Sequence, residues 1–364
     1  MSNRAQLQPA LLVLADGEVF EGEAIGAPAP GGVAGGEVVF NTVLSGYQEV
    51  LSDRSYAGQI ITFTYPHIGN YGTNAEDDES ASPACRGVII RDLARRRSNW
   101  RAEEDLDGYL RRHGVPGIAG IDTRRLTRHL RDAGAMPGAF GTADEAALAA
   151  AATAEPGTDG VDLVSTVTTP EAYTVGTGRL RVVAYDFGIK RTILRHLAGF
   201  ATVEVVPAGT PADQVLAAKP DGIFLSNGPG DPVMLPGPVA AIREIVDAGV
   251  PTFGICLGHQ LLCTALGGTT TKLAFGHHGG NHPVRRLRDN TVEITSQNHN
   301  FNVEEGSVEG ARTTHVNLND GTLEGIRCED RPAFSIQYHP EAGPGPHDAR
   351  YLFDEFRALM EGDG

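Results

Sequence analysis

A cysteine between two glycines is the residue of this chain with the clearest chemistry. Cys256 lies in the heptapeptide GICLGHQ, residues 254–260, directly after the apolar run 250–253. A strand that ends in G-x-C-x-G and continues as a helix is typical of a nucleophile elbow, in which the glycines allow a tight turn that presents one side chain. The helix N-terminus behind the turn favours a thiolate over a thiol. We therefore predict that Cys256 is a nucleophile.

A base and an orienting acid for this nucleophile are found in His339-Pro340-Glu341, which follows a strand-like run. The proline restricts the backbone between the two side chains, so a hydrogen bond from the histidine to the carboxylate is feasible. A cysteine after a strand is more often a small buried apolar residue, but the elbow and this second motif together favour a triad. Such triads are defined by geometry and role, not by chain order.

Other histidines and cysteines are less suited to a catalytic or metal-binding role. His259 is the competing base, but the turn should aim Cys256 away from the helix body, so we expect His259 to pack beside the elbow. Cys263 lies well inside the helix and is expected in the core. The histidines His277, His278 and His282 have no cysteine or carboxylate partners at metal-binding spacing, so no metal site is expected.

A second loop, SNGPGDP at residues 226–232, also follows a predicted strand. Its G-P and D-P pairs are typical of an ordinary turn. If the strand is parallel to the one before Cys256, both loops open at the same sheet edge. The backbone N–H groups of Gly228 and Gly230 could then approach a ligand and, with that of Leu257, form an oxyanion hole.

The sequence pattern in the second half of the chain predicts the fold that positions these motifs. From residue 180 onward, apolar strands alternate with segments of helical spacing up to the elbow. This pattern favours a doubly wound, mostly parallel sheet with the site at the carboxyl ends of its strands. The first part is rich in β-branched, glycine-bounded segments, at 10–14, 37–42 and 59–65, with one helix late in it, at 121–134. The fold class is therefore α/β, with a β-rich N-terminal domain.

The expected boundaries are an N-terminal domain over 1–141, a linker over 142–178 with a short alanine-rich surface helix, and a second domain over 179–364. The first twenty residues indicate a strand entering a hairpin, not a signal peptide.

The composition argues against several classes of protein and partner. The 364 residues carry a formal net charge of −16 without any basic block, which argues against a nucleic acid or an anionic membrane surface as partner. No apolar run reaches the length of roughly 18 residues that a transmembrane helix needs. Four cysteines without a CxxC pair favour a reduced, cytoplasmic setting.

The three motifs, in this order, resemble those of class I (triad-type) glutamine amidotransferases, which hydrolyse the glutamine side-chain amide and pass ammonia to a synthase. The N-terminal segments 40–56, 64–74 and 117–134, together with SQNHNF at 296–301, resemble the family of small, glutaminase subunits of carbamoyl phosphate synthetase. The resemblance covers nearly the whole chain, apart from the alanine-rich stretch near 142–160.

The resemblance implies roles for individual residues. Cys256 would be the nucleophile, with His339 and Glu341 completing the triad, and Ser55 would reach L-glutamine from the other domain. Gln260 lies four residues after Cys256, on the same side of the helix. Position 300 is often glycine in relatives, and asparagine would suit a left-handed backbone there. The implied contacts to glutamine and its oxyanion are Ser55, Gly228, Gly230, Leu257, Gln260, Asn298, Asn300 and Phe301.

The resemblance also implies a partner. The chain has no P-loop or other ATP motif, so no cofactor is expected on it. ATP and Mg would be bound by a separate large subunit that makes carbamoyl phosphate for arginine and pyrimidine biosynthesis. A heterodimer, or a higher oligomer of heterodimers, is expected, with the N-terminal domain as docking surface.

Two other classes of function fit the sequence less well. A stand-alone cysteine hydrolase would not need the loop at 226–232 or the N-terminal segments. A non-catalytic scaffold would not need Cys256, His339 and Glu341 together.

Overall fold

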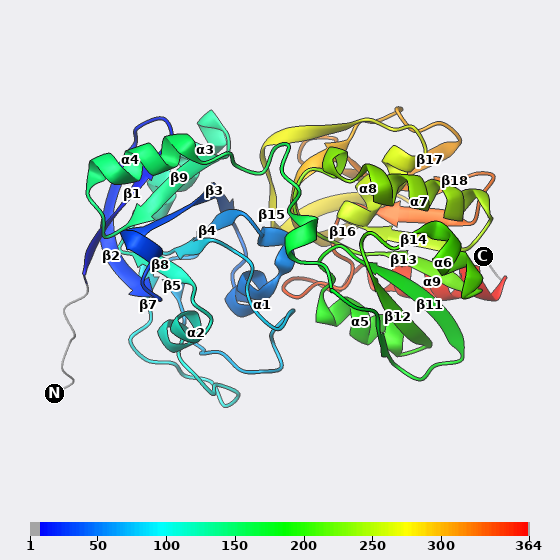
Figure 1. Cartoon of the computed structure of the whole chain (residues 1–364), viewed down its shortest axis with the longest axis horizontal. Coiled ribbons are helices and arrows are strands. Elements are labelled where there is room, and N and C mark those ends of the chain that lie inside the picture. Colours follow the sequence, from blue (N-terminus) through cyan, green and yellow to red (C-terminus); the bar gives the residue numbers. More distant parts are fainter. Residues whose placement is uncertain (1–7, 363–364) are drawn as a thin grey trace. The chain divides into compact units, whose positions relative to one another are not determined.

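The computed structural model describes residues 8–362. Its internal contacts divide the chain into two compact units, Met1–Val161 and Asp162–Gly364. Figure 1 shows the strands and helices of each unit.

The first unit is built on a closed barrel (Figure 1). The strands follow the order β1 (Pro9–Leu14), β2 (Val19–Gly26), β8 (Pro116–Ala119), β6 (Gly87–Ile89), β4 (Gln59–Phe63), β3 (Val33–Asn41) and β9 (Met136–Gly141). Strands β1 and β2 form the predicted N-terminal hairpin, and residues 1–7 lie outside the described residues. The predicted β-rich domain is confirmed.

The helices of this unit are α1 (Tyr47–Ser52), α2 (Leu106–Arg112), α3 (Thr123–Ala133) and α4 (Glu145–Ala154), and a small sheet pairs β5 (His67–Ile68) with β7 (Asp92–Leu93). The predicted helix over 121–134 is confirmed as α3. It begins at the cap residue Asp122, whose carboxylate accepts the N–H of Arg125, and it ends at Gly134. Its apolar face, Leu126 and Leu130, is buried against the barrel.

The second unit contains a ten-stranded sheet. Its centre is parallel, in the order β12 (Ala201–Pro207), β11 (Leu180–Asp186), β13 (Gly222–Leu225), β14 (Thr252–Ile255) and β19 (Ala333–Ile336). An antiparallel extension adds β18 (Leu323–Cys328), β17 (Ala311–Asn317), β15 (Thr270–Arg286) and β16 (Thr291–Val303). The predicted parallel sheet is thus its centre, whereas the antiparallel extension was not expected from the sequence.

Helices cover both faces of the parallel centre, as in a doubly wound fold (Figure 1). One core contains apolar residues of α6 (Ala212–Ala217), α7 (Pro236–Asp247) and α8 (Leu257–Ala265). The other core contains those of α5 (Arg191–Ala198) and α9 (Tyr351–Glu361). Burying a Leu, Ile or Phe side chain contributes roughly 1.5–3 kcal/mol, so two cores hold the central strands in place.

The segment expected to be a linker, 142–178, carries structure of its own. Helix α4 packs its buried Leu148 and Ala152 against β1 and β9. Strand β10 (Tyr173–Val175) pairs with β12 in the second unit. The contacts divide the chain between these two elements, after Val161. Within residues 8–362, no helix is both long and apolar enough to cross a bilayer.

Candidate active site

The turn after β14 has the geometry of a nucleophile elbow. Cys256 has φ 55° and ψ −107°, an uncommon conformation for a residue with a side chain, and α8 begins at the next residue. A Cβ atom on Gly254 would lie 2.7 Å from the carbonyl oxygen of Gly258. A Cβ atom on Gly258 would lie 2.1 Å from that of Leu225. Both glycines are therefore needed for the turn to pack against the sheet.

The Cys256 side chain is buried and faces β16. Its thiol sulfur lies 3.4 Å from the carbonyl oxygen of Asn298, to which it can donate. Its backbone N–H donates to the carbonyl of Ile336 at 2.9 Å. Cys256 is thus held between the strand that leads to His339 and the strand that carries SQNHNF.

His339 and Glu341 form the predicted pair. The Nδ1 atom of His339 lies 2.6 Å from Oε1 of Glu341. The other ring nitrogen, Nε2, has no partner at hydrogen-bond geometry within residues 8–362, which leaves it available for a proton transfer. Burial lowers the pKa of His339, but the Glu341 carboxylate and the Cys256 sulfur outweigh burial and raise that pKa to about 10. The imidazolium form is therefore favoured.

A buried lysine that was not predicted from the sequence extends this pair. The Nζ atom of Lys190 lies 2.9 Å from Oε1 of Glu341 and donates to the carbonyl of Ala342 at 2.6 Å. Burial raises the pKa of Glu341, but the charges of Lys190 and His339 outweigh it and lower that pKa to about 2. Lys190 follows β11, so its position at the carboxyl end of a parallel strand was the signal available in the sequence.

The loop at residues 226–232 meets the elbow directly. A Cβ atom on Gly228 would lie 2.2 Å from the carbonyl oxygen of Phe187 and 2.9 Å from the side chain of Leu257. Gly230 has φ 87°, where glycine is favoured. The N–H of Gly258 donates to the carbonyl of Ser226 at 3.0 Å. The structure thus brings Gly228 beside Leu257, the first residue of α8.

Gln260 points from α8 to β16. Its side-chain amide nitrogen donates to the carbonyl of Phe301 at 2.7 Å and to Oε1 of Gln337 at 3.2 Å. The residue is buried, as is Phe301. Gln260 therefore holds the strand whose Asn298 carbonyl contacts Cys256.

Asn298 and Asn300 share one histidine. Their Oδ1 atoms each lie 2.9 Å from a ring nitrogen of His278, the first from Nδ1 and the second from Nε2. Asparagine at position 300 would have suited a left-handed backbone, but the structure does not use one there. Asn300 lies inside strand β16 and is not among the residues with positive φ.

Ser55 belongs to the first unit, in the 3-10 turn Arg54–Tyr56, where its N–H donates to Oδ1 of Asp53 at 2.9 Å. It is not among the residues that the second unit gathers around Cys256.

The competing histidine is part of the core, as predicted. The Nδ1 atom of His259 lies 2.8 Å from the hydroxyl of Ser335, and burial lowers the pKa of His259 to about 3. Cys263 is fully buried, and burial raises the pKa of its thiol. Neither group is suited to acid–base exchange near neutral pH.

The expectation that the histidines near 277 lack carboxylate partners is wrong. The Nε2 atom of His277 lies 2.7 Å from Asp320, and the ligand atoms of His277, His299 and Glu324 lie within 4.8 Å of one another. These partners come from β18 and the turn before it, which no local spacing could reveal. Both ring nitrogens of His299 already have hydrogen-bond partners, so the cluster is organised as a hydrogen-bond network.

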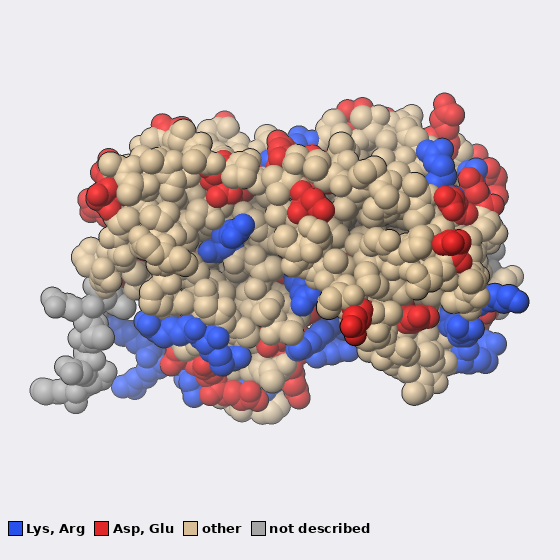
Figure 2. All heavy atoms as spheres, viewed as in Figure 1, with Lys and Arg blue, Asp and Glu red and all other residues tan. Residues whose placement is uncertain are grey.

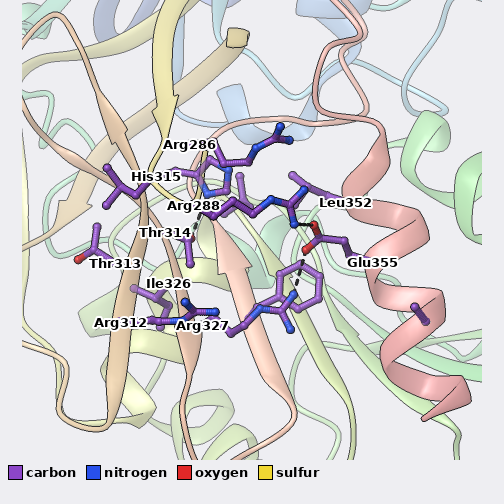
Figure 3. Close-up of a pocket in the computed structure, with 14 residues that line it drawn as sticks. Arg286, Arg288, Arg312, Thr313, Thr314, His315, Ile326, Arg327, Leu352 and Glu355 are labelled. Carbon is purple, nitrogen blue, oxygen red and sulfur yellow. Dashed lines mark hydrogen bonds and ion pairs between the residues drawn. The ribbon is translucent and has the colours of Figure 1, made fainter. Parts of the chain in front are cut away.

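A cavity of about 630 Å³ lies elsewhere in the second unit (Figure 3). Arginines 286, 288, 312 and 327 line it, and Glu355 of α9 pairs with two of them, Arg288 and Arg327. None of the residues predicted for catalysis or glutamine binding lines this cavity.

The fold and the elbow of the second unit define a class I glutamine amidotransferase domain, and residues 183–359 match the model of the family described as glutamine amidotransferase class-I. Residues 12–140 match the carbamoyl-phosphate synthase small chain, CPSase domain. The chain belongs to the carbamoyl phosphate synthase small chain family. It is accordingly a subunit of the glutamine-hydrolysing synthase.

Full-length relatives show this membership. The chain is 56% identical over 375 residues to the carbamoyl phosphate synthase small chain of Thioalkalivibrio sulfidiphilus, with 98% of each chain covered. It is 54% identical over 381 residues to that of Rubrivivax gelatinosus, with 98% of each covered. It is 53% identical over 377 residues to that of Escherichia coli K12, again with 98% of each covered.

Proposed function

We propose that Cys256, His339 and Glu341 hydrolyse L-glutamine to glutamate and ammonia through a glutamyl thioester. The observation that carries the proposal is the 2.6 Å contact between Nδ1 of His339 and Glu341, with the unpartnered Nε2 of the same ring close to a cysteine at a strained elbow. A buried imidazole with a raised pKa stays protonated beside a thiolate nucleophile. It can then donate its proton to the leaving nitrogen as a general acid.

In the first half-reaction, the Cys256 thiolate attacks the amide carbon of glutamine, and the carbonyl oxygen becomes an oxyanion. The imidazolium of His339 protonates the amide nitrogen, the carbon–nitrogen bond breaks, and ammonia leaves. Cys256 is then joined to the glutamyl group as a thioester, and His339 is neutral. Glu341 stabilises the charged imidazole and keeps its Nε2 directed at the reacting groups.

In the second half-reaction, neutral His339 takes a proton from water as the water oxygen attacks the thioester carbon. The carbon–sulfur bond breaks, glutamate leaves, and the thiolate–imidazolium pair is restored. No redox step or cofactor is needed on this chain. Water is the only co-reactant.

The oxyanion would be held by backbone N–H groups of Gly228, Gly230 and Leu257, and each such donor is worth ~3 kcal/mol in an acyl-transfer site. The close packing of Gly228 against Leu257 supports this grouping. The remaining proposed glutamine contacts are Ser55, Gln260, Asn298, Asn300 and Phe301.

The ammonia would pass to a large chain of the synthase, which would bind ATP and Mg and make carbamoyl phosphate in the cytoplasm for arginine and pyrimidine biosynthesis. The full-length relatives are small chains, which implies a large counterpart. Free ammonia is mostly protonated in neutral water and is then no nucleophile, so a heterodimer with a sheltered path suits the chemistry.

Replacing Cys256 with Ser tests the assignment. We expect glutamate release from glutamine to fall at least ~10³-fold, because an alcohol near neutral pH is a far weaker nucleophile than a thiolate. Cys328→Ser is the matched control, since Cys328 is also buried but lies in β18, and it should retain activity. Glutamine turnover that persists in the Cys256→Ser protein would show that another group is the nucleophile.

A further inference from the structure

The cavity of about 630 Å³ in the second unit lies apart from the proposed glutaminase residues (Figure 3). The strands β15, β17, β18 and β19, with the turn after β15, supply one wall of it, and helix α9 supplies the other. Small-molecule sites in proteins have volumes of roughly 300–1,000 Å³. The cavity is therefore large enough for an organic ligand.

The wall of this cavity carries more positive than negative charge. Glu355 is the only carboxylate among the described residues that line it, against four arginines at positions 286, 288, 312 and 327. Arg286 lies 2.8 Å from Asp289 and 3.0 Å from Glu293, and Asp289 also lies 3.7 Å from Arg288. Figure 2 shows acidic and basic side chains mixed at the right-hand end of this unit, on a chain of net charge −16. Four arginines around one carboxylate thus form a local excess of positive charge.

Two of the arginines converge on one carboxylate. Arg288 lies 2.7 Å from Oε1 of Glu355, and Arg327 lies 2.9 Å from Oε2, as the dashed lines in Figure 3 mark. Aromatic rings hold both guanidiniums, since that of Arg327 lies 4.8 Å from the ring centre of Phe334 and that of Arg288 lies 5.7 Å from that of Tyr351. The two guanidiniums are thus preorganised for an oxyanion.

A third arginine has no counterion. Arg312 lies directly opposite Arg327 in the antiparallel pairing of β17 with β18. Arg327 pairs with Glu355, whereas Arg312 makes no ion pair within residues 8–362. Like charges directly opposite each other on neighbouring strands are destabilising. An anion bound beside both arginines would remove that repulsion.

The rest of the wall is apolar. Side chains from β18, β19 and α9 line it, namely Ile326, Phe334, Ile336 and Leu352. A free inorganic anion would leave this surface uncovered, whereas a ligand with an apolar group would bury it and gain free energy. The wall therefore favours a ligand that joins an oxyanion to an apolar group.

The charge of the arginines favours a phosphate over a carboxylate as that oxyanion. Glu355 already supplies one carboxylate at a high effective concentration, so a ligand with a single carboxylate has little advantage over it. A phosphate monoester carries about −1.5 to −2 charges at pH 7 and has three strong acceptor oxygens. It can therefore pair with three guanidiniums, one more than Glu355 does.

We propose that this cavity, here called the arginine cavity, binds a small organic phosphate. The phosphate group lies between Arg288, Arg312 and Arg327, where it displaces the carboxylate of Glu355. The organic group covers the apolar wall. This site goes beyond the proposed function, because none of the residues proposed for glutamine hydrolysis lines the arginine cavity.

Calorimetric titration of the full chain with phenyl phosphate tests the proposal, because this compound joins a phosphate to a flat apolar ring. We expect one equivalent to bind with a Kd below about 1 mM. Inorganic phosphate, which covers no apolar surface, and benzoate, which carries a single charge, should each bind at least ~10-fold more weakly. The absence of saturable binding of phenyl phosphate overturns the proposal, and equal affinity for benzoate overturns the choice of phosphate.

Variants locate the binding. Arg312→Gln should weaken the binding of phenyl phosphate at least ~10-fold, because a charge-assisted hydrogen bond is lost. Its stability in urea should equal or exceed that of the wild type, because the cross-strand repulsion is relieved. Arg285→Gln is the matched control, since Arg285 is an exposed arginine of β15 that does not line the cavity, and this variant should bind as the wild type does.

Glu355→Gln tests the competing carboxylate. Without this internal anion, phenyl phosphate should bind about 10-fold more tightly. If Arg312→Gln binds as tightly as the wild type, or if Glu355→Gln gains no affinity, the phosphate does not bind in the arginine cavity. Cys256→Ser should bind phenyl phosphate as the wild type does, so failure of the proposed glutaminase site and failure of the arginine cavity are distinguished.

Discussion

At the scale of single residues, positively and negatively charged side chains alternate through the site. Lys190 contacts Glu341, Glu341 contacts His339, and His339 is held next to Cys256. Each ion is buried, so each would be costly alone, and the arrangement is stable because every charge has an opposite neighbour. The same neighbours keep Glu341 ionised and His339 protonated.

Lys190→Met tests this line of charge. Removing the cation leaves Glu341 with one partner, so we expect the pKa of Glu341 to rise and the acid limb of the kcat/KM profile to move to higher pH. Activity at neutral pH should fall about 10- to 100-fold, and the protein should lose about 3 kcal/mol of stability.

The measurements for this variant are a pH profile of glutaminase activity and denaturant unfolding. Lys219→Met, at an exposed lysine of the same unit, is the control and should match the wild type. An unshifted acid limb would mean that Lys190 has only a packing role.

At the scale of elements, the site forms where strands end. Strands β11, β13, β14 and β19 are parallel neighbours, and the residues after them are Lys190, the loop at 226–232, Cys256 and His339. Parallel strands present their carboxyl ends at one edge, so four distant segments meet there. The antiparallel strand β16 completes the edge with the Asn298 carbonyl.

A buried acid lies further along this antiparallel extension. Burial raises the pKa of Glu324 to about 7, although Asn317 and Gln297 each donate a hydrogen bond to its Oε1. The folded-state pKa exceeds the ordinary value of 4.5, so the native protein holds a proton that the unfolded chain releases. Stability contributed by this group is therefore present below pH 4.5 and is lost as pH rises through about 7.

Glu324→Gln removes the titration and keeps the oxygen that accepts both hydrogen bonds. We expect the variant to be more stable than the wild type at pH 8, by about 2 kcal/mol, and nearly equal to it at pH 5. Urea unfolding at the two pH values measures this difference. Equal effects at both values would show that Glu324 keeps its charge throughout this range.

At the scale of the whole molecule, the proposed triad and one proposed glutamine contact belong to different units. The second unit holds Cys256, His339, Glu341 and Lys190, whereas Ser55 belongs to the barrel unit. A stand-alone hydrolase and a subunit of a synthase differ in whether a partner chain changes glutamine turnover.

Mixing the chain with its large chain tests this division. We expect glutamine turnover to rise at least ~10-fold when the large chain, ATP and bicarbonate are present, because association can complete a site that is less active alone. Glutamate release measures it. In the complex, Cys256→Ser should abolish glutamine-dependent synthesis and leave ammonium-dependent synthesis of carbamoyl phosphate intact. Full activity of the chain alone, unchanged on mixing, would favour a stand-alone hydrolase.

Much of this site was predictable from the sequence because the relevant geometry is local. The elbow depends on two glycines within four residues of one another, and His339 and Glu341 are two residues apart. The strand and helix order of the second unit follows from hydrophobic spacing in the same way. Local patterns determine local turns, so these parts of the site needed no tertiary information.

The remaining parts depended on contacts between distant segments. Lys190 reaches Glu341 across 151 positions, and the thiol of Cys256 reaches the Asn298 carbonyl across 42. No spacing rule links such pairs. The carboxylates near His277 were not expected for the same reason, because they reach it only through the placement of β15, β16 and β18 in one sheet. The sequence by itself predicted the proposed nucleophile, its proposed base and the parallel strands beneath them, because those patterns are local, whereas only the tertiary structure decided which buried charges surround that base.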